Sequence, residues 1–417
     1  MLVAGATQAE VDDVKDALKQ QWRMTDLGPV AWVLGVSIER REEGALLSQS
    51  AYIKSLAKKF GQENGRKTYT PLPPDLPTRD GEPFPDRQLY QTIVGMLLWV
   101  GIATRGDVAF AAGYLGRHSA APTYEHWNMD TTHDIGLYFA KNTVAKHLEG
   151  WSDADYAGDR DTRRSTTGYA FKVFGALVSW GARRQDIVAT STVHAEYVAM
   201  AESARENAYL RTLLSDLHHP VPGPTTLHGD NEGALTLVTK PAFHQRTKHI
   251  EVRWHYIREA QERGDVSVQS IRSAQQQADI LTKPLPAPTH EKHRRALGLL
   301  RRDEVDAEEE RQQKRVSDAH GPHTHTRRDT THLGPHISQH GHPTPHPDPY
   351  RPEASAHGPG RAGRGGRGGR ARGSRREAGN AMRGHELDEE RRQEDGVVSG
   401  REQGEHASGS THISWAW

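Results

Sequence analysis

The chain has 417 residues, a formal net charge of +0 at pH 7 and an apolar fraction of 35%, below the roughly 45% usual for globular proteins. We therefore expect about two or three domains together with a segment that does not fold. The balanced charge by itself indicates no nucleic-acid partner, and the lack of cysteine excludes disulfides and cysteine-ligated zinc. No apolar run approaches the roughly 18 residues of a membrane span, and the N-terminus is no signal peptide, so we expect an intracellular protein without a membrane.

The first part of the chain, to about residue 64, has the pattern of a folded segment. Thr7 and Glu10 match a capping box, and apolar residues then recur at three- and four-residue steps, which predicts a helix. Two strands are expected at 31–39 and 46–49, followed by a helix through Phe60. The next stretch carries six prolines between positions 71 and 85, so it is a connector, and an apolar helix is expected at 89–103.

From about residue 145 the pattern predicts a small α/β domain. Three strands form a meander, and a long helix, a strand, further helices, a last strand and a short helix follow. Such an order indicates a mixed sheet with helices on its faces. The expected strands lie at 148–152, 169–174, 177–180, 225–229 and 266–270.

Four acidic residues each lie at the edge of one of these elements. Asp153 ends a strand, Glu196 lies in the first turns of the long helix, Asp230 closes a second strand and Asp279 begins the last short helix. Carboxylates are the hard oxygen ligands that Mg²⁺ prefers, and two ions about 3.5–4 Å apart can activate water and stabilise a leaving oxygen. The ordered set therefore indicates a two-metal nuclease. Asp155 remains an alternative. We prefer Asp153 because Asp153 directly ends its predicted strand.

Ordered sequence motifs run through residues 1 to about 300. They include Asp26-Leu27-Gly28, Leu47-Ser48-Gln49, Thr70-Pro71-Leu72, Glu125-His126-Trp127, Ser152-Asp153-Ala154-Asp155-Tyr156, Thr166-Thr167-Gly168-Tyr169, Ala195-Glu196-Tyr197, Asp230-Asn231, Lys248-His249-Ile250 and Ala278-Asp279-Ile280-Leu281-Thr282-Lys283-Pro284. In these motifs the chain resembles the C-terminal part of a copia-type retrotransposon polyprotein, in which the end of the reverse transcriptase is followed by a ribonuclease H domain.

The resemblance implies a division into three parts. Residues 1–144 would be a truncated palm end, thumb and connection remnant of the reverse transcriptase. Residues 145–300 would form an α/β, ribonuclease H-like mixed five-stranded sheet with flanking helices. Residues 301–417 are expected to be a disordered tail rich in Arg, His and Gly, because this composition cannot bury enough apolar surface to offset the ordering entropy.

The resemblance also implies a metal assignment and a reaction. Asp153 would bridge two Mg²⁺ ions, with Mn²⁺ as a substitute, while Glu196 and Asp230 would hold one ion and Asp279 the other. The expected activity is endonucleolytic hydrolysis of the RNA strand of an RNA:DNA hybrid. Polymerase activity is expected to be absent, because the Tyr-x-Asp-Asp motif of the family would lie upstream of Met1.

Several residues are candidates for nucleic-acid contacts, each with a structural alternative. Arg163, Arg164 and Ser165 can hold phosphate or form a solvated loop, and Asn231 can reach the minor groove or cap a helix. The remaining candidates are the helical residues Lys248, His249 and Arg253, where His249 can also be an ordinary surface or half-buried helical histidine. The arginine- and glycine-rich run 361–376 has the composition of RNA-binding segments, and its alternative is translated flanking sequence with biased codons.

The alternative to an enzyme is a catalytically silent transposon remnant that at most binds nucleic acid. It stays open because an amputated palm can prevent folding or substrate placement. Family resemblance suggests the cytoplasm, within a virus-like particle, or the nucleus, and leaves any separate polymerase partner unidentified.

Overall fold

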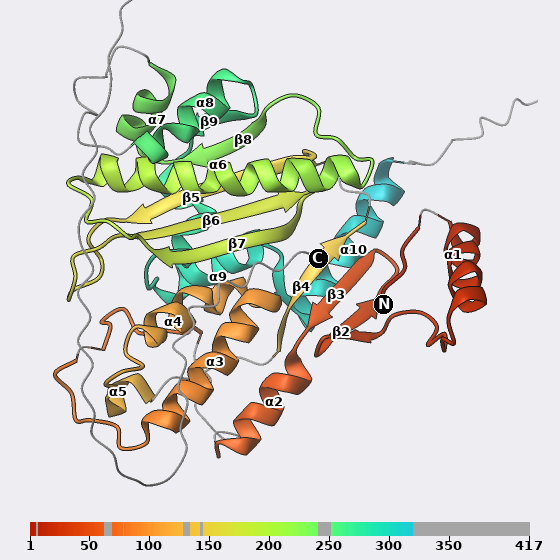
Figure 1. Ribbon diagram of the computed structural model, residues 1–417, viewed down its shortest axis with the longest axis horizontal. Helices are drawn as coiled ribbons and strands as arrows, with labels where there is room; N and C mark the ends of the chain where they lie inside the picture. Colours follow the sequence, from red (N-terminus) through yellow and green to blue (C-terminus); the bar gives the residue numbers. More distant parts are fainter. Residues whose placement is uncertain are drawn as a thin grey trace, which may run out of the picture. The chain divides into compact units, whose positions relative to one another are not determined.

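The computed structural model describes residues 1–319 except 6, 62–68, 78, 128–133, 142–144 and 241–251. Its strands form two five-stranded sheets, one with the order β1-β2-β3-β4-β10 and one with the order β7-β6-β5-β8-β9. We call them the N-terminal sheet and the central sheet (Figure 1). The candidates Lys248 and His249 fall outside the described residues.

The N-terminal sheet is antiparallel throughout and draws on distant parts of the chain. A turn with φ of 49° at Leu34 and 76° at Gly35 divides the expected strand 31–39 into two. The final strand comes from far along the chain and pairs with β4, so the sheet is complete only with residues near position 300. Its strands are β1 (Trp32–Val33), β2 (Val36–Arg40), β3 (Gly44–Ser48), β4 (Ile135–Ala140) and β10 (Leu299–Arg301).

The three helices expected in the first 127 residues are present, and two further helices, which were not expected, follow them. The predicted capping box is present, since Thr7 Oγ1 accepts from the Glu10 N–H and Glu10 Oε2 accepts from the Thr7 N–H. A long apolar helix packs beside the central sheet, where Trp180 Nε1 donates to the Gly101 carbonyl at 2.7 Å. The helices are α1 (Gln8–Gln21), α2 (Ser50–Lys59), α3 (Arg87–Ala103), α4 (Gly106–Gly116) and α5 (Tyr124–Trp127).

The central sheet confirms the predicted mixed α/β fold. Strands β5, β6 and β7 form the expected antiparallel meander, whereas β8 and β9 add in parallel on the other side of β5. The carboxyl ends of β5 and β8 therefore lie at the same edge of the sheet. The strands are β5 (Leu148–Asp155), β6 (Thr166–Val173), β7 (Ala176–Arg184), β8 (Thr225–Gly229) and β9 (Val266–Ser270).

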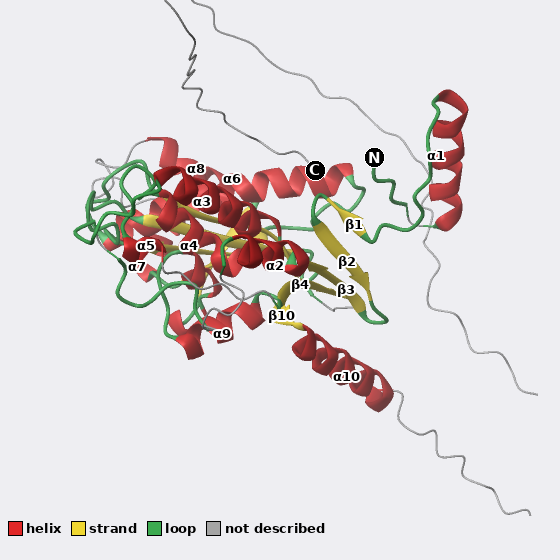
Figure 2. Ribbon diagram, turned by 90° about the horizontal axis from the view of Figure 1, so that it is seen from below, coloured by secondary structure: helices red, strands yellow, loops and turns green. Residues whose placement is uncertain are grey.

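Helices cover both faces of the central sheet. On one face α6 (Thr192–Asp216) crosses the strands and packs with α7 (Glu232–Thr239) and α8 (Tyr256–Glu262) around a core that includes Phe171 and Tyr197 (Figure 1). On the other face the 3₁₀ helix η4 (Gln277–Leu281) contributes Ile280 and Leu281 to a core shared with β4 and β10. The helix α9 (Ala287–Ala296) connects η4 to β10 (Figure 2).

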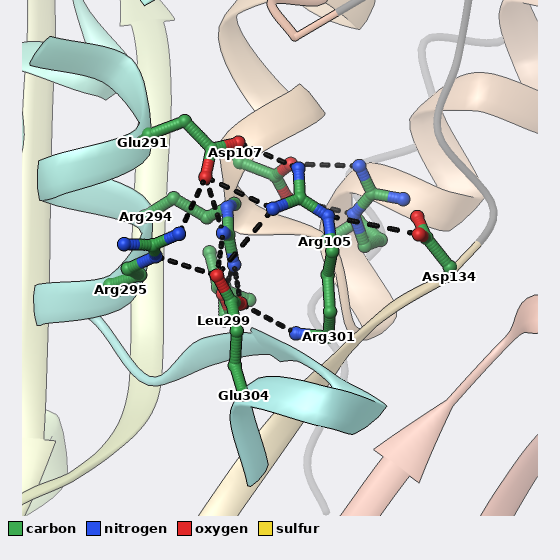
Figure 3. A network of polar contacts seen from close by, with 9 residues as sticks. All are labelled: Arg105, Asp107, Asp134, Glu291, Arg294, Arg295, Leu299, Arg301 and Glu304. Carbon is green, nitrogen blue, oxygen red and sulfur yellow. Dashed lines mark hydrogen bonds and ion pairs between the residues drawn. The ribbon is translucent and has the colours of Figure 1, made fainter. Parts of the chain in front are cut away.

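The chain remains ordered past residue 301, where composition alone predicts the tail to begin. Helix α10 covers Arg302–Ala319. Its first turn joins a network of ion pairs, in which the buried Arg294 guanidinium contacts Glu304 at 2.8 Å and Glu291 at 2.6 Å (Figure 3). Val305, on the same helix, is fully buried. Because these contacts stabilise the first turns of α10, the expected start of the tail at 301 is wrong. Within the expected tail, residues 320–417 lie outside the described structure.

Candidate active site

Asp153 lies near the end of β5, and its carboxylate accepts a hydrogen bond from the segment that follows η4. Its side chain is buried, and Thr282 Oγ1 donates to its Oδ2 at 2.5 Å. This contact requires η4 to approach the sheet closely. Gly168 pairs with Asp153 on β6, and a Cβ atom there would lie 2.5 Å from Thr282 Cγ2 and 3.0 Å from the Ala278 carbonyl. Glycine at position 168 therefore allows η4 to reach the carboxylate.

Glu196 projects from the first turns of α6. Ser191 caps this helix, since its Oγ accepts from the His194 N–H at 3.1 Å. The helix lies close to β5 because small side chains fill the contact, namely Ala154, Ala189, Ala195 and Ala199. As a result the Glu196 carboxylate is buried beside the end of β5.

Asp230 reaches the same place from β8. Trp151 of β5 is paired with His228 of β8 in parallel register, so Asp153 and Asp230 each follow two residues after a paired position. Parallel strands carry such residues to one edge of the sheet, as the sequence order of the two acids implies. Asp230 is half-buried, whereas the other two acids are buried.

Asp153, Glu196 and Asp230 form a carboxylate group that can hold a cation. Each offers an oxygen, and the three oxygens lie within 4.8 Å of one another. Glu196 Oε2 is buried and has no hydrogen-bond partner among the described residues. A buried acceptor without a donor costs free energy, and a divalent ion at this point would satisfy it. Oxygen-only ligands fit Mg²⁺ or Mn²⁺ better than a metal that prefers nitrogen or sulfur.

The electrostatics of this carboxylate group favour an added positive charge. Burial raises the pKa of Asp153 to about 7, and the charges of Asp279 and Asp230 add to this effect. Burial also raises the pKa of Glu196 to about 9, together with repulsion from Asp153 and Asp230. Buried carboxyls that repel one another retain protons until a cation replaces them. Binding of a divalent ion is thus expected to release protons near neutral pH.

Asp279 lies beside the carboxylate group and contacts a lysine. It sits within η4, and Lys283 Nζ lies 2.9 Å from its Oδ1 and 3.8 Å from Asp153 Oδ2. Burial raises the pKa of Asp279. Burial alone would lower the pKa of Lys283, but the charges of Asp153 and Asp279 raise it, so this ammonium stays charged. Lys283 was not among the residues predicted from sequence, although its position four residues after Asp279 places it in the same motif.

Asp155 and Asp159, which lie close to Asp153 in the sequence, do not belong to the carboxylate group. Asp155 is half-buried and is not part of the group that Asp153 forms with Glu196 and Asp230. Asp159 has ion pairs with Arg117 at 3.3 Å and Arg184 at 2.9 Å. Although burial opposes it, hydrogen bonds from Thr162 and Arg184 hold the pKa of Asp159 well below its usual range. Because β5 continues to Asp155, the expectation that Asp153 directly ends its strand is wrong, and its grouping with Glu196 and Asp230 is what distinguishes Asp153 from these acids.

The expected nucleic-acid contacts are only partly accessible. Ser165 is fully buried and its Oγ accepts from the Ala157 N–H at 3.1 Å, so the expectation that it grips phosphate is wrong. Arg163 is exposed with φ of 54°, and Arg164 is half-buried. Asn231 caps α7, since its Oδ1 accepts from the Ala234 N–H at 3.0 Å. Arg253 lies in the 3₁₀ helix η2 (Val252–His255).

The central sheet and its flanking helices have the ribonuclease H-like arrangement expected from the sequence. The family described as "Reverse transcriptase (RNA-dependent DNA polymerase)" matches residues 1–74. The chain is 33% identical over 320 residues to the "Retrovirus-related Pol polyprotein from transposon TNT 1-94" of Nicotiana tabacum, covering 72% of this chain and 24% of that protein. It is 31% identical over 312 residues to the Pol polyprotein from transposon RE2 of Arabidopsis thaliana, covering 72% of this chain and 21% of the relative. The chain belongs to the copia-type retrotransposon Pol family.

The chain spans about a quarter of the length of these polyproteins. A solved structure, RNase H1 from the halophilic archaeon Halobacterium salinarum NRC-1, is similar at 16% identity and a TM-score of 0.24, covering 32% of this chain and 93% of that one. Within the described ranges, no helix is both long and apolar enough to cross a membrane.

Proposed function

We propose that this protein is a divalent-metal-dependent endonuclease that hydrolyses the RNA strand of RNA:DNA hybrids. The observation that carries the proposal is the convergence of Asp153, Glu196 and Asp230 within 4.8 Å at one edge of the central sheet. In the family to which the chain belongs, this domain follows the polymerase. Residues 1–144 then correspond to the end of a reverse transcriptase, and 145–300 to the ribonuclease H domain.

Each carboxylate has a distinct part in this proposal. Asp153 would bridge two ions, Glu196 and Asp230 would complete the ligands of one, and Asp279 would belong to the other. Bound Mg²⁺ or Mn²⁺ would activate a water and stabilise the leaving 3′ oxygen of the RNA. The protein's own contribution is positional, because Thr282 fixes the orientation of Asp153 and the small residues of α6 hold Glu196 against β5.

The proposed substrate contacts come from the loop after β5, from the start of α7 and from the arginine-rich run. Arg163 is exposed and can contact phosphate, with Arg164 beside it. Asn231 can contribute only its amide nitrogen, since its oxygen caps α7. The arginine- and glycine-rich run 361–376 is proposed as an additional RNA contact made by phosphate binding and stacking. We place the activity inside the cell, in the cytoplasm or nucleus, on family membership alone.

The test uses the full-length purified chain and a hybrid whose RNA strand is end-labelled. Cleavage of the RNA strand is expected with Mg²⁺ or Mn²⁺ and not with EDTA, while the DNA strand and duplex DNA remain intact. Far-ultraviolet circular dichroism and a cooperative thermal transition serve as the control for folding. A protein that folds but leaves the hybrid intact in both metals would establish the silent remnant instead.

A further inference from the structure

A single ammonium group occupies the space between two acids of the candidate active site. Lys283 Nζ lies 2.9 Å from Asp279 Oδ1 and 3.8 Å from Asp153 Oδ2. Among the described residues, the ion pairs of this nitrogen are with these two carboxylates. It therefore stands where a cation shared by Asp153 and Asp279 would bind.

The backbone around Lys283 is fixed, whereas its side chain can leave. Thr282 is anchored to Asp153, and the Lys283 N–H donates to the Asp279 carbonyl at 3.3 Å. The side chain of Lys283 is 36% exposed, in contrast to 3% for Asp153 and 11% for Asp279. Rotation of a long, partly exposed side chain is fast compared with catalysis. The ammonium can thus vacate its position without any change of the fold.

The carboxylate group of Asp153, Glu196 and Asp230 forms a separate cation position that Lys283 does not fill. One carboxylate oxygen from each of the three residues lies within 4.8 Å of the other two. Glu196 Oε2 has no hydrogen-bond donor among the described residues. Asp153 belongs to both positions. With one divalent ion in the carboxylate group and the ammonium beside Asp279, the four acids are almost neutralised. A second divalent ion beside an unmoved Lys283 would bring like charges together.

We propose that Lys283 is a built-in competitor for the second metal ion: the substrate-free protein binds one divalent ion, and a second ion enters only when the ammonium leaves Asp279 and Asp153. This inference rests on the proposed two-ion function and assigns Lys283 a positioning role in it. An RNA phosphate entering the site offers the ammonium another anion, so substrate binding favours entry of the second ion.

The test counts bound Mn²⁺ in the substrate-free, full-length chain by electron paramagnetic resonance, without any measurement of cleavage. Wild-type protein is expected to bind one Mn²⁺, whereas Lys283→Gln and Lys283→Met bind two. Lys283→Arg retains the charge and is expected to bind one. Lys240→Met, which removes an exposed ammonium at the end of α7, is the matched control and also binds one.

A second readout is thermal stability. Loss of the ammonium leaves Asp153 and Asp279 facing each other, so Lys283→Gln lowers Tm in EDTA and Mn²⁺ restores it, while Lys240→Met does neither. Equal Mn²⁺ counts in wild type and both neutral variants would overturn the inference, as would two ions in the wild type. Failure of the wild type to cleave hybrid is a separate result that refutes the proposed function, since the ion count does not depend on cleavage.

Discussion

Thr282 Oγ1 donates a hydrogen bond of 2.5 Å to Asp153 Oδ2, across 129 positions of sequence. The contact joins the segment after η4 to the end of β5 and fixes the acid that would be shared by both metal ions. The Thr282 side chain is fully buried. The stability of the segment and the geometry of the site are therefore coupled through one side chain.

Replacement of this hydroxyl tests the coupling. Thr282→Val keeps the shape but leaves the buried Asp153 carboxylate with one donor fewer, which is expected to cost about 1–3 kcal/mol of unfolding free energy. Thr212→Val is the matched control, because Thr212 is exposed and its hydroxyl donates to the Ala208 carbonyl of its own helix. Urea denaturation in EDTA measures the unfolding free energy of both variants and of the wild type. A loss no greater than that of Thr212→Val would show that Thr282 does not hold Asp153.

The pH dependence of stability follows from the raised pKa values. Burial raises the pKa of Asp153 to about 7 and that of Glu196 to about 9. A carboxyl whose pKa is higher in the folded than in the unfolded protein stabilises the fold below the unfolded value of about 4, and this contribution is lost as the pH rises through the folded pKa. In EDTA the Tm is therefore expected to fall between about pH 5 and 9.

Glu196→Gln removes one of these groups and serves as the reference. The variant is expected to show a flatter Tm profile and to exceed the wild type at pH 8 to 9 in EDTA, with the difference vanishing when Mn²⁺ is added to the wild type. Differential scanning calorimetry across this pH range gives both curves. Parallel curves for the two proteins would contradict the raised pKa of Glu196.

The length of chain needed for stability is set by α10. The buried Arg294 pairs with Glu304, so Glu304→Gln leaves a buried charge with weaker compensation, for which losses of about 3–5 kcal/mol of unfolding free energy are typical.

Truncation after Ala319 is expected to leave the Tm unchanged, whereas truncation after Leu300 lowers it. Glu308→Gln, on the same helix and paired with the exposed Arg311, is the control with little effect. Equal Tm values for both truncations would refute this account of α10.

Sequence reasoning succeeded where the signal is local. The capping box of α1, the meander and the place of Asp230 directly after β8 follow from periodicity and from parallel pairing, whereas β5 continues past Asp153 to Asp155. It failed where partners are distant. The polar composition after residue 301 does not reveal that α10 is folded, because the helix is stabilised by contacts of Glu304 and Val305 with earlier segments. The burial of Ser165 likewise depends on the folded loop around Ala157. Lys283 acquires a role only when η4 packs against β5.

The central claim is that Asp153, Glu196 and Asp230 hold the metal that cleaves RNA. The most direct measurement compares hybrid cleavage by Asp230→Asn and Asp155→Asn in the full-length chain with Mg²⁺. Asparagine keeps the shape but removes the ligand charge, so Asp230→Asn is expected to lower the cleavage rate by more than about 100-fold, beyond the loss typical of a residue that only supports a ligand. Asp155→Asn, outside the carboxylate group, is expected to stay within about a few-fold of wild type. Unimpaired cleavage by a folded Asp230→Asn protein would contradict the account.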